Sequence, residues 1–280
     1  MVGTNKKLTL SYSKINTYLE CRKRYWWEYE QDLTPKARRV APSVGDVVHR
    51  LRRKWHLDRL LVTDVEFLQE RVQQLYPDMS DDDIEQVCRK ALRLFDAYIN
   101  QWDRSKFEIA SPEVTFELEC EVAGQPFVIM AKLDGICKTP DGRLWRDELK
   151  TSSRTDPSYL AGLRNPLQTG IYHWVTNEVL KKQGQHIIGT VFTMLVDTKV
   201  PQCTQTPHMT GTWLTDLAKQ TVYGVAEDIL TNKPLYPSTK CLLFYECPYL
   251  ELCRSDTPAK RENYTSREEV KQRSKDQDLL

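Results

Sequence analysis

The sequence has no apolar run approaching the roughly 18 residues that a membrane-spanning helix requires. Its opening residues, Met1–Lys7, are polar and lack the apolar stretch of a secretory leader. These absences predict a cytoplasmic protein with no membrane partner. In a reducing compartment, the eight cysteines favour ligation of a metal or a cluster over a framework of disulfides.

A strong net charge is also missing, because 40 Lys and Arg nearly balance 39 Asp and Glu. The charge is nevertheless uneven, since residues 1–60 carry 14 basic against 6 acidic side chains. The basic side chains alternate with aromatic ones in Arg22–Trp27 and His49–Trp55. Cations contact phosphates and exposed rings stack on unpaired bases, so this pattern predicts a nucleic-acid surface. The candidate contacts are Arg22, Lys23, Arg52 and Arg53.

Length and an apolar content of 40% allow a full hydrophobic core. Residue patterns predict an α/β (α+β) chain with three parts. These are an N-terminal helical region over 1–105, a core over 106–253, and a charged tail over 254–280. Within the core we expect strands between 113 and 151, a helix over 167–182, a strand over Ile187–Asp197 and a helix over 213–230. The tail is expected to be disordered or a loosely attached helix.

A hairpin in this core brings two carboxylates together. Phe127–Cys137 and Leu144–Thr151 have the composition of strands, and Thr139–Gly142 between them has turn chemistry. If the hairpin is centred near Asp141, Asp134 and Glu148 lie opposite each other. Like charges so close destabilise a sheet, and a bound cation removes the conflict.

The chemistry of the hairpin follows from its residue types. Hard carboxylate oxygens suit Mg²⁺ or Mn²⁺, which stabilises charge on phosphoryl oxygens. Lys150 shares a strand face with Glu148, whereas Asp147 points the other way and is the weaker candidate ligand. Lys150 would orient the attacking water. The same residues also fit a surface hairpin with a cross-strand lysine pair.

Two helices carry further candidate residues. Val44, Val48, Leu51 and Trp55 recur at helical spacing, so 44–56 is predicted to be a helix with His49, Arg52 and Arg53 on a neighbouring stripe. A lone histidine on a helix is more often packed or solvated than a metal ligand. In the helix that begins near Leu167, Gln168 and Tyr172 lie one turn apart and face the same way.

Together these segments resemble the PD-(D/E)xK nuclease superfamily, with Glu148-Leu-Lys150 as the acidic and lysine motif. Leu10–Tyr25, Val44–His49 and Gln168–Tyr172 are similar to the N-terminal, histidine and Gln-x-x-x-Tyr motifs of its RecB-like branch, in family order. That branch includes exonucleases of phages and of CRISPR adaptation. The resemblance implies a restriction-endonuclease-like core, a central mixed sheet flanked by helices.

The resemblance also implies roles for individual residues. His49, Asp134, Glu148 and the backbone carbonyl of Leu149 would bind the metal. Gln168 and Tyr172 would position substrate and support Lys150. Glu113 matches an acidic position found in part of the family.

The cysteines form a second constellation. Cys241, Cys247 and Cys253 lie close together near the C-terminus, and Cys21 lies far away in sequence. Four thiolates can hold a [4Fe–4S] cluster or a structural zinc, and free buried thiols are a third alternative. In RecB-like relatives, one N-terminal and three C-terminal cysteines bind a [4Fe–4S] cluster. The remaining cysteines have no ligand spacing and are expected to be core or surface thiols.

The function expected from sequence is therefore metal-dependent hydrolysis of DNA, most simply by an exonuclease that acts on single strands or free ends in a prokaryotic or phage setting. Two alternatives remain open. One is a structure-selective endonuclease, and the other is a cluster-stabilised DNA-binding subunit without turnover.

Overall fold

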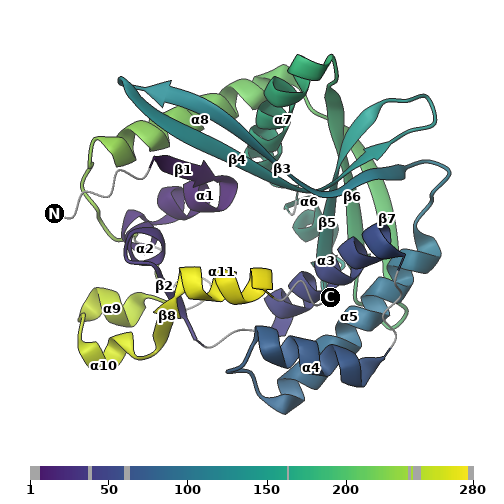
Figure 1. Ribbon diagram of the computed structural model, residues 1–280, viewed down its shortest axis with the longest axis horizontal. Helices are drawn as coiled ribbons and strands as arrows, with labels where there is room; N and C mark the ends of the chain where they lie inside the picture. The colour runs from purple at the N-terminus through teal and green to yellow at the C-terminus, as the bar shows by residue number, and fades with distance from the viewer. Residues whose placement is uncertain are drawn as a thin grey trace.

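The computed structural model of the protein describes residues 7–36, 40–59, 64–162, 164–238, 241 and 247–276. Within these residues, six strands form one mixed sheet with helices packed on both faces (Figure 1). The predicted fold class, a central mixed sheet flanked by helices, is confirmed. The segment 242–246, between two of the clustered cysteines, lies outside the described residues.

The strands are β1 (Leu8–Ser11), β2 (Leu33–Pro35), β3 (Glu108–Val122), β4 (Gln125–Lys138), β5 (Leu144–Ser152), β6 (Ile187–Val196), β7 (Gln202–Met209) and β8 (Tyr264–Ser266). The α-helices are α1 (Tyr12–Glu20), α2 (Arg22–Tyr25), α3 (Val40–Asp58), α4 (Val65–Leu75), α5 (Asp81–Gln101), α6 (Pro157–Gly162), α7 (Pro166–Leu180), α8 (Thr212–Leu230), α9 (Leu250–Arg254), α10 (Pro258–Arg261) and α11 (Arg267–Asp276). A π-helical turn spans Trp26–Glu30 and a 3₁₀ turn spans Lys181–Gln183.

The long strand β4 organises the sheet. On one edge, β3 pairs with it antiparallel from Glu108↔Lys138 to Val122↔Gln125. The other edge is shared, because β1 pairs in parallel with residues 127–130 and β5 pairs antiparallel with residues 135–138. Residues 131–134 therefore lie where β1 and β5 diverge. Beyond β5, the strand β6 pairs in parallel and β7 pairs antiparallel with β6.

Helices bury apolar side chains against each face of this sheet. On one face, α3, α4 and α5 pack over Trp145, Leu149 and Val191. On the other face, α1, α7 and α8 pack over β4 at Phe127 and Ile129. The predicted apolar stripe of α3 is buried as expected.

The N-terminal region differs from the purely helical one expected from its sequence. Leu8–Ser11 enters the central sheet as β1, and Leu33–Pro35 pairs antiparallel with β8. Ser11 ends β1 and caps α1, since its hydroxyl accepts the Lys14 N–H at 3.4 Å. Strands of three or four residues are too short for alternation to reveal them.

The tail over 254–280 is expected to be disordered or a loosely attached helix. Within the residues described, which extend to 276, it forms α10, β8 and the helix α11, and β8 pairs with β2. Tyr264 in β8 stacks on Tyr249 with ring centroids 5.6 Å apart. Both belong to a small third core with Trp27 and Leu252, so the N- and C-terminal segments are joined there. The charged composition of this segment gave no indication of the contact between Tyr264 and Tyr249, which attaches it to the third core.

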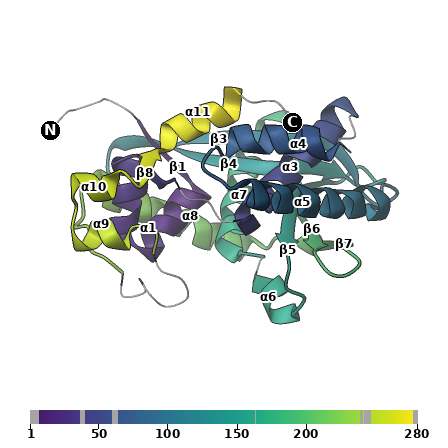
Figure 2. The same cartoon turned by 90° about the horizontal axis from the view of Figure 1, so that it is seen from below.

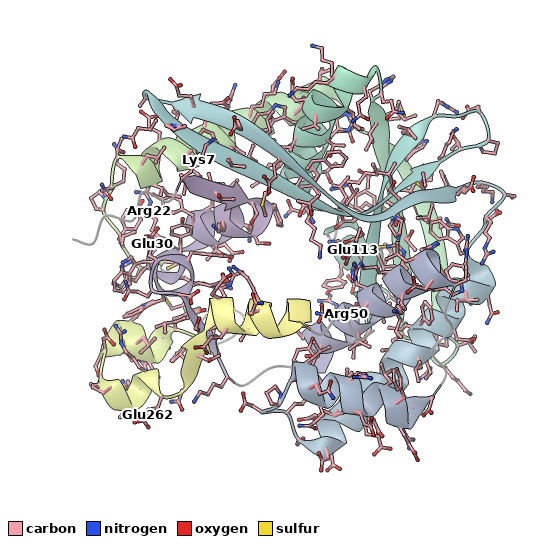
Figure 3. All side chains as sticks on the ribbon, in the orientation of Figure 1. Lys7, Arg22, Glu30, Arg50, Glu113 and Glu262 are labelled. Carbon is pink, nitrogen blue, oxygen red and sulfur yellow. The ribbon has the colours of Figure 1, made fainter. Side chains whose placement is uncertain are left out.

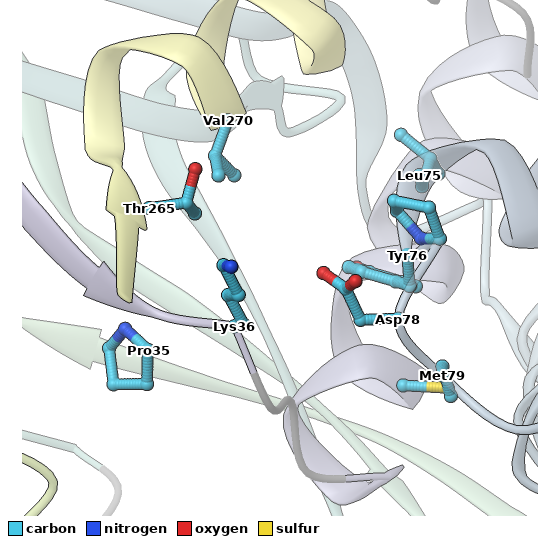
Figure 4. Close-up of a pocket in the computed structure, with 9 residues that line it drawn as sticks. Pro35, Lys36, Leu75, Tyr76, Asp78, Met79, Thr265 and Val270 are labelled. Carbon is cyan, nitrogen blue, oxygen red and sulfur yellow. The ribbon is translucent and has the colours of Figure 1, made fainter. Parts of the chain in front are cut away.

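A small pocket lies where this C-terminal segment approaches the turn between α4 and α5. Lys36 and Val270 line one side of it, and Tyr76 and Met79 line the other (Figure 4). In the view from below, α11 extends towards α4 (Figure 2). The C-terminal segment thus lies beside the helices that cover one face of the sheet.

The close crossing of α7 and α8 gives a first testable prediction. A Cβ atom at Gly170 would lie 2.6 Å from the Leu214 carbonyl oxygen and 2.8 Å from the Ala218 Cβ. Gly170→Ala should therefore destabilise the protein by about 1–3 kcal/mol, despite the better helix propensity of alanine. Chemical denaturation would measure the change.

Gly224→Ala on α8 is the matched control, because a Cβ atom added at Gly224 would meet nothing within 4 Å. This change should stabilise by roughly 0.5–1 kcal/mol. A Gly170→Ala protein as stable as the parent would contradict the close helix crossing.

Candidate active site

Asp134 lies on β4 at the point where β1 and β5 diverge. The hairpin register pairs Gly135 with Asp147, so Asp134 and Glu148 are the next residues opposite each other, as a hairpin centred on Asp141 predicts. Asp134 Oδ2 accepts the backbone N–H of Leu149 at 2.8 Å. The carboxylate is thus held across the gap between the two strands.

Glu148 and Lys150 project from the same face of β5. Lys150 Nζ lies 2.5 Å from Glu148 Oε1, and both side chains contact Gln168. The Gln168 amide donates to Glu148 Oε1 at 3.0 Å, and its carbonyl oxygen accepts from Lys150 Nζ at 3.4 Å. Gln168 itself is fixed because Asn165 caps α7 and accepts the Gln168 N–H at 3.0 Å.

His49 reaches the site from α3. Its Nδ1 lies 3.5 Å from Asp134 Oδ1, and the two side chains are 28% and 23% exposed. That distance is long for a direct hydrogen bond, and the two groups lie close enough that a small movement would let both contact one cation. Gly45, one turn earlier, lets α3 approach β5, since a Cβ there would lie 3.2 Å from Thr151 Oγ1.

Glu148 is almost fully buried beside two cationic side chains. Burial opposes its ionisation, but the neighbouring charges of Arg146 and Lys150 outweigh burial and the pKa of Glu148 is lowered. Arg146 lies 3.5 Å from Glu148 Oε2 and donates to Thr190 at 3.1 Å. Sequence reasoning missed Arg146, although its position two residues before Glu148 places it on the same strand face.

Two tyrosines line the other side of Glu148. Tyr172 is buried one turn after Gln168, and the Arg146 guanidinium lies 5.1 Å from its ring centroid. Burial, and then the Glu148 charge, raise the pKa of Tyr172. Tyr12 packs edge-on against Tyr172 with centroids 6.4 Å apart, so α1 also borders the site.

Glu113 falls opposite Asp134 on β3, between the pairs Pro112↔Gly135 and Val114↔Leu133. Its φ of 40° is rare for a residue with a side chain, and such strained positions cluster at functional sites. Glu113 Oε2 lies 3.4 Å from Arg53 Nε and 3.4 Å from Lys132 Nζ. A carboxylate and two cations therefore border Asp134 from the β3 side.

The four residues expected to contact nucleic acid lie in different environments in the structure. Arg52 is only 3% exposed and pairs with Asp147 inside the protein, so the expectation that it contacts DNA is wrong. Helical spacing placed Arg52 beside His49 but could not show that it faces the sheet. Arg53 is 33% exposed and stays next to Glu113.

The two basic residues of α2 lie elsewhere. Arg22 pairs with Asp228 of α8 at 2.5 Å and lies between the rings of Tyr18 and Tyr236. Lys23 Nζ lies 3.6 Å from the Trp26 ring centroid. Arg22 and Glu113 are labelled in the left and right halves of Figure 3, so Arg22 lies well away from Glu113.

The structure gathers the four clustered cysteines despite their distance in sequence. The Ser238 N–H donates to Cys21 Sγ at 3.3 Å, and the Cys241 thiol donates to the Ser238 carbonyl at 3.1 Å. Burial raises the pKa of both Cys247 and Cys253, and Cys21 and Cys241 raise it further. The four thiols therefore lie in one region of the molecule, although among the described residues they do not converge as a formed metal site.

The remaining cysteines lie apart from this group. Cys88 and Cys137 are fully buried in the core, as free thiols, and Cys120 and Cys203 are partly buried. Burial raises the pKa of Cys88 to about 11 and that of Cys137 to about 12. They are core or partly exposed thiols, as expected.

The donors around Asp134 fit a hard divalent cation. Carboxylate oxygens and one imidazole nitrogen are ligands that Mg²⁺ and Mn²⁺ accept. Among the described residues, no three His, Cys, Asp or Glu side chains already converge as a metal site. Glu148 is directed at Lys150 and Gln168, so binding a cation would require its carboxylate to turn towards Asp134.

Comparison with known proteins places this arrangement in a family. The model of the PD-(D/E)XK nuclease superfamily matches residues 9–254. The chain belongs to that superfamily. The match covers the candidate residues from α1 to Cys253, the last of the clustered cysteines, and it supports a nuclease that hydrolyses nucleic acid.

Two solved structures are similar to this chain. A structure named "putative exonuclease" from Eubacterium rectale is 14% identical, with 86% of this chain and 91% of that one covered and a TM-score of 0.52. A second, named SSO0001, is 16% identical, with 76% and 97% covered and a TM-score of 0.37. No curated protein matches the chain.

Within the part of the chain described, no helix is long and apolar enough to cross a bilayer.

Proposed function

We propose that this nuclease is a Mg²⁺- or Mn²⁺-dependent DNA exonuclease of the RecB-like branch, active in prokaryotic or phage recombination, repair or DNA processing. The observation that carries the proposal is the meeting of His49, Asp134, Glu148, Lys150 and Gln168 from four separate elements. A histidine from a preceding helix beside the first carboxylate supports the RecB-like assignment. A merely structural hairpin would not need these groups to converge.

The metal would be held by His49, Asp134 and Glu148, with the Leu149 carbonyl as a further ligand. The bound ion would supply electrostatic stabilisation of the charge that develops on the phosphoryl oxygens. Asp134 is already fixed by the Leu149 N–H, so it needs little rearrangement. Glu148 would exchange its contact with Lys150 for the cation.

Lys150 has the role closest to the reacting atoms. It is 25% exposed, and its contacts with Glu148 and Gln168 keep the ammonium at the mouth of the site. Once Glu148 turns to the metal, the ammonium can hold the attacking water and stabilise the phosphate oxygens. Gln168 would hold the Lys150 and Glu148 side chains in position relative to each other, and Tyr172 would support Gln168 from the next turn of α7.

The four clustered cysteines would bind a [4Fe–4S] cluster. The proposal is supported by Cys21 and Cys241, which both contact Ser238, and iron–sulfur clusters and zinc are both satisfied by four thiolates. The cluster would join the N-terminal segment at Cys21 to the C-terminal segment at Cys253. Its function here would be structural, because Cys247 packs against the small third core rather than against the sheet that carries Lys150.

Action at DNA ends is proposed because one metal site that borders a strand is entered most simply from a free end. The exonuclease name of the Eubacterium rectale structure is consistent with this choice. End-labelled linear single strands should be degraded much faster than closed circles in Mn²⁺, and EDTA should stop the reaction. Gel analysis of both substrates would measure the two rates.

Other outcomes would identify the alternatives. Equal rates on circles and linear strands would replace the exonuclease with an endonuclease. DNA binding without cleavage in either metal would indicate a subunit that has lost turnover. Degradation of RNA but not DNA would correct the substrate.

Arg53 gives a separate prediction about substrate binding. It is the remaining candidate next to the site, and each lost phosphate contact should flatten the dependence of log affinity on log salt by roughly one unit. Arg53→Gln should therefore weaken binding of single-stranded DNA and lower its salt dependence. Titration at several salt concentrations would measure both, with Lys106→Gln on an exposed turn as the control. An unchanged slope would place the DNA path on another face.

A further inference from the structure

Arg52 occupies a buried position between the three elements that carry the candidate metal ligands. It belongs to α3, and its partner Asp147 belongs to β5. Their side chains are 3% and 0% exposed. The protein has 40 Lys and Arg residues, and arginine is rarely buried so deeply unless it is paired. The burial of Arg52 therefore indicates a role inside the protein rather than at its surface.

The buried pair is hydrogen-bonded on both sides. Arg52 Nη2 pairs with Asp147 Oδ2, and Arg52 Nε donates to the Tyr98 hydroxyl at 3.2 Å. Asp147 Oδ1 accepts from the Thr193 hydroxyl at 2.9 Å. Each charged group thus has a second hydrogen-bond partner on a neighbouring element. Arg52 contacts α5 through Tyr98, and Asp147 contacts β6 through Thr193.

Gly135 makes room for this guanidinium on β4. A Cβ at Gly135 would lie 3.4 Å from Arg52 Nη2, 3.6 Å from Asp147 Oδ2 and 3.2 Å from the Ser111 carbonyl oxygen. The missing side chain at position 135 lets Arg52 lie directly against the strand. The guanidinium therefore contacts β4 and β5 at once while it belongs to α3.

Arg52, Asp147 and Gly135 each lie close in sequence to a candidate ligand. Gly135 follows Asp134, Asp147 precedes Glu148, and Arg52 lies one helical turn after His49. One guanidinium thus fixes the backbone next to each ligand, on the sheet face opposite Glu148 and Lys150.

We propose that Arg52 is a positioning residue, whose buried pair with Asp147 sets the separation of α3 from β4 and β5 and so keeps His49, Asp134 and Glu148 close enough to bind one cation when Glu148 turns towards Asp134. The inference rests on the proposed function, because it assumes that these three residues bind the cation. Stability alone does not explain the pair, since apolar side chains of similar volume commonly serve a core as well or better. A directional pair fixes distances that apolar packing leaves adjustable.

The test compares metal affinity with stability in protein without DNA. Mn²⁺ binding would be followed by electron paramagnetic resonance or calorimetry, and stability by thermal unfolding. The double variant Arg52→Met with Asp147→Leu removes both charges and keeps an apolar core. It should unfold near the wild-type temperature but bind Mn²⁺ about 10- to 100-fold more weakly, as the loss of a supporting contact around a metal site does.

Two further variants keep the result interpretable. Val225→Ala in the opposite core should lower thermal stability and leave Mn²⁺ affinity unchanged. Arg52→Lys retains the charge but cannot span Asp147 and Tyr98 together, so it should also weaken Mn²⁺ binding. This variant supplies the measurement if the double variant does not fold.

The outcomes separate this inference from the proposed function. A wild-type protein that binds no Mn²⁺ would refute the metal site itself. Wild-type Mn²⁺ affinity in the double variant or in Arg52→Lys would overturn the positioning role while leaving the metal site standing. Equal weakening in Val225→Ala would show that affinity follows global stability and would also overturn it.

Discussion

Asp134→Asn, Glu148→Gln and Lys150→Ala should each reduce DNA cleavage by at least about three orders of magnitude. The carboxylates would hold the cation and Lys150 would act on the attacking water, so all three interactions are strongest in the transition state. Affinity for DNA should change little, because loss of an interaction made only in the transition state lowers kcat and kcat/KM together. Single-turnover cleavage and equilibrium binding would measure the two effects.

Two variants of the same hairpin provide controls. Asp141→Asn lies in the turn and Lys138→Ala at the exposed end of β4, and both should cleave at nearly the wild-type rate. Circular dichroism should show folded protein throughout, although Glu148→Gln is expected to lose some stability because Arg146 is left with less compensation. Turnover close to wild type in any of the three site variants would remove that residue from the site.

Much of the candidate site could be predicted because its spacing is local. The turn at Thr139–Gly142 sets the register, and strand alternation then separates Glu148 and Lys150 from Asp147. The same logic gave Gln168 and Tyr172 one turn apart on α7. In each case, two residues within one element or one hairpin determine the geometry.

The wrong or missing predictions concern residues whose burial depends on parts of the chain that are distant in sequence. Arg52 and Arg53 are adjacent on α3, yet one is buried against Asp147 and the other lies next to Glu113. No feature of the helix alone distinguishes them, because the distinction comes from the sheet packed against it. Arg146 was missed for the same reason, since its burial depends on α7 and β6 covering that strand face.

The fold shows the same division between local and distant information. The helices over Val40–Asp58 and Thr212–Leu230 and the strand Ile187–Val196 follow from periodicity in continuous segments. By contrast, β1 is four residues long and is defined by its pairing with β4. The tail is ordered through its contact with β2, which is more than two hundred residues away in sequence.

The clustered cysteines should have the largest effect on stability. Cys21→Ser or Cys253→Ser should abolish the brown colour and the bound iron of anaerobically purified protein and lower its unfolding temperature sharply. A link between positions 21 and 253 closes a loop of more than two hundred residues, and the chain-entropy model assigns such a link roughly 5 kcal/mol. Iron and sulfide analysis, visible absorption and thermal unfolding would measure these changes.

Cys120→Ser on β3 is the matched control, because Cys120 is partly buried like Cys21 and belongs to a different core. It should retain colour, iron and nearly all of the stability.

Loss of a clustered cysteine should destabilise the terminal segments more than the sheet. Cys21 contacts Ser238 and Cys253 contacts Trp27, so each thiol joins a segment from one end of the chain to a segment from the other. Either substitution should therefore release the C-terminal segment before the sheet unfolds, and limited proteolysis should cut near α9 first. Colourless protein with one zinc per chain would favour a structural zinc, and protein with neither metal would leave four free thiols and contradict the cluster.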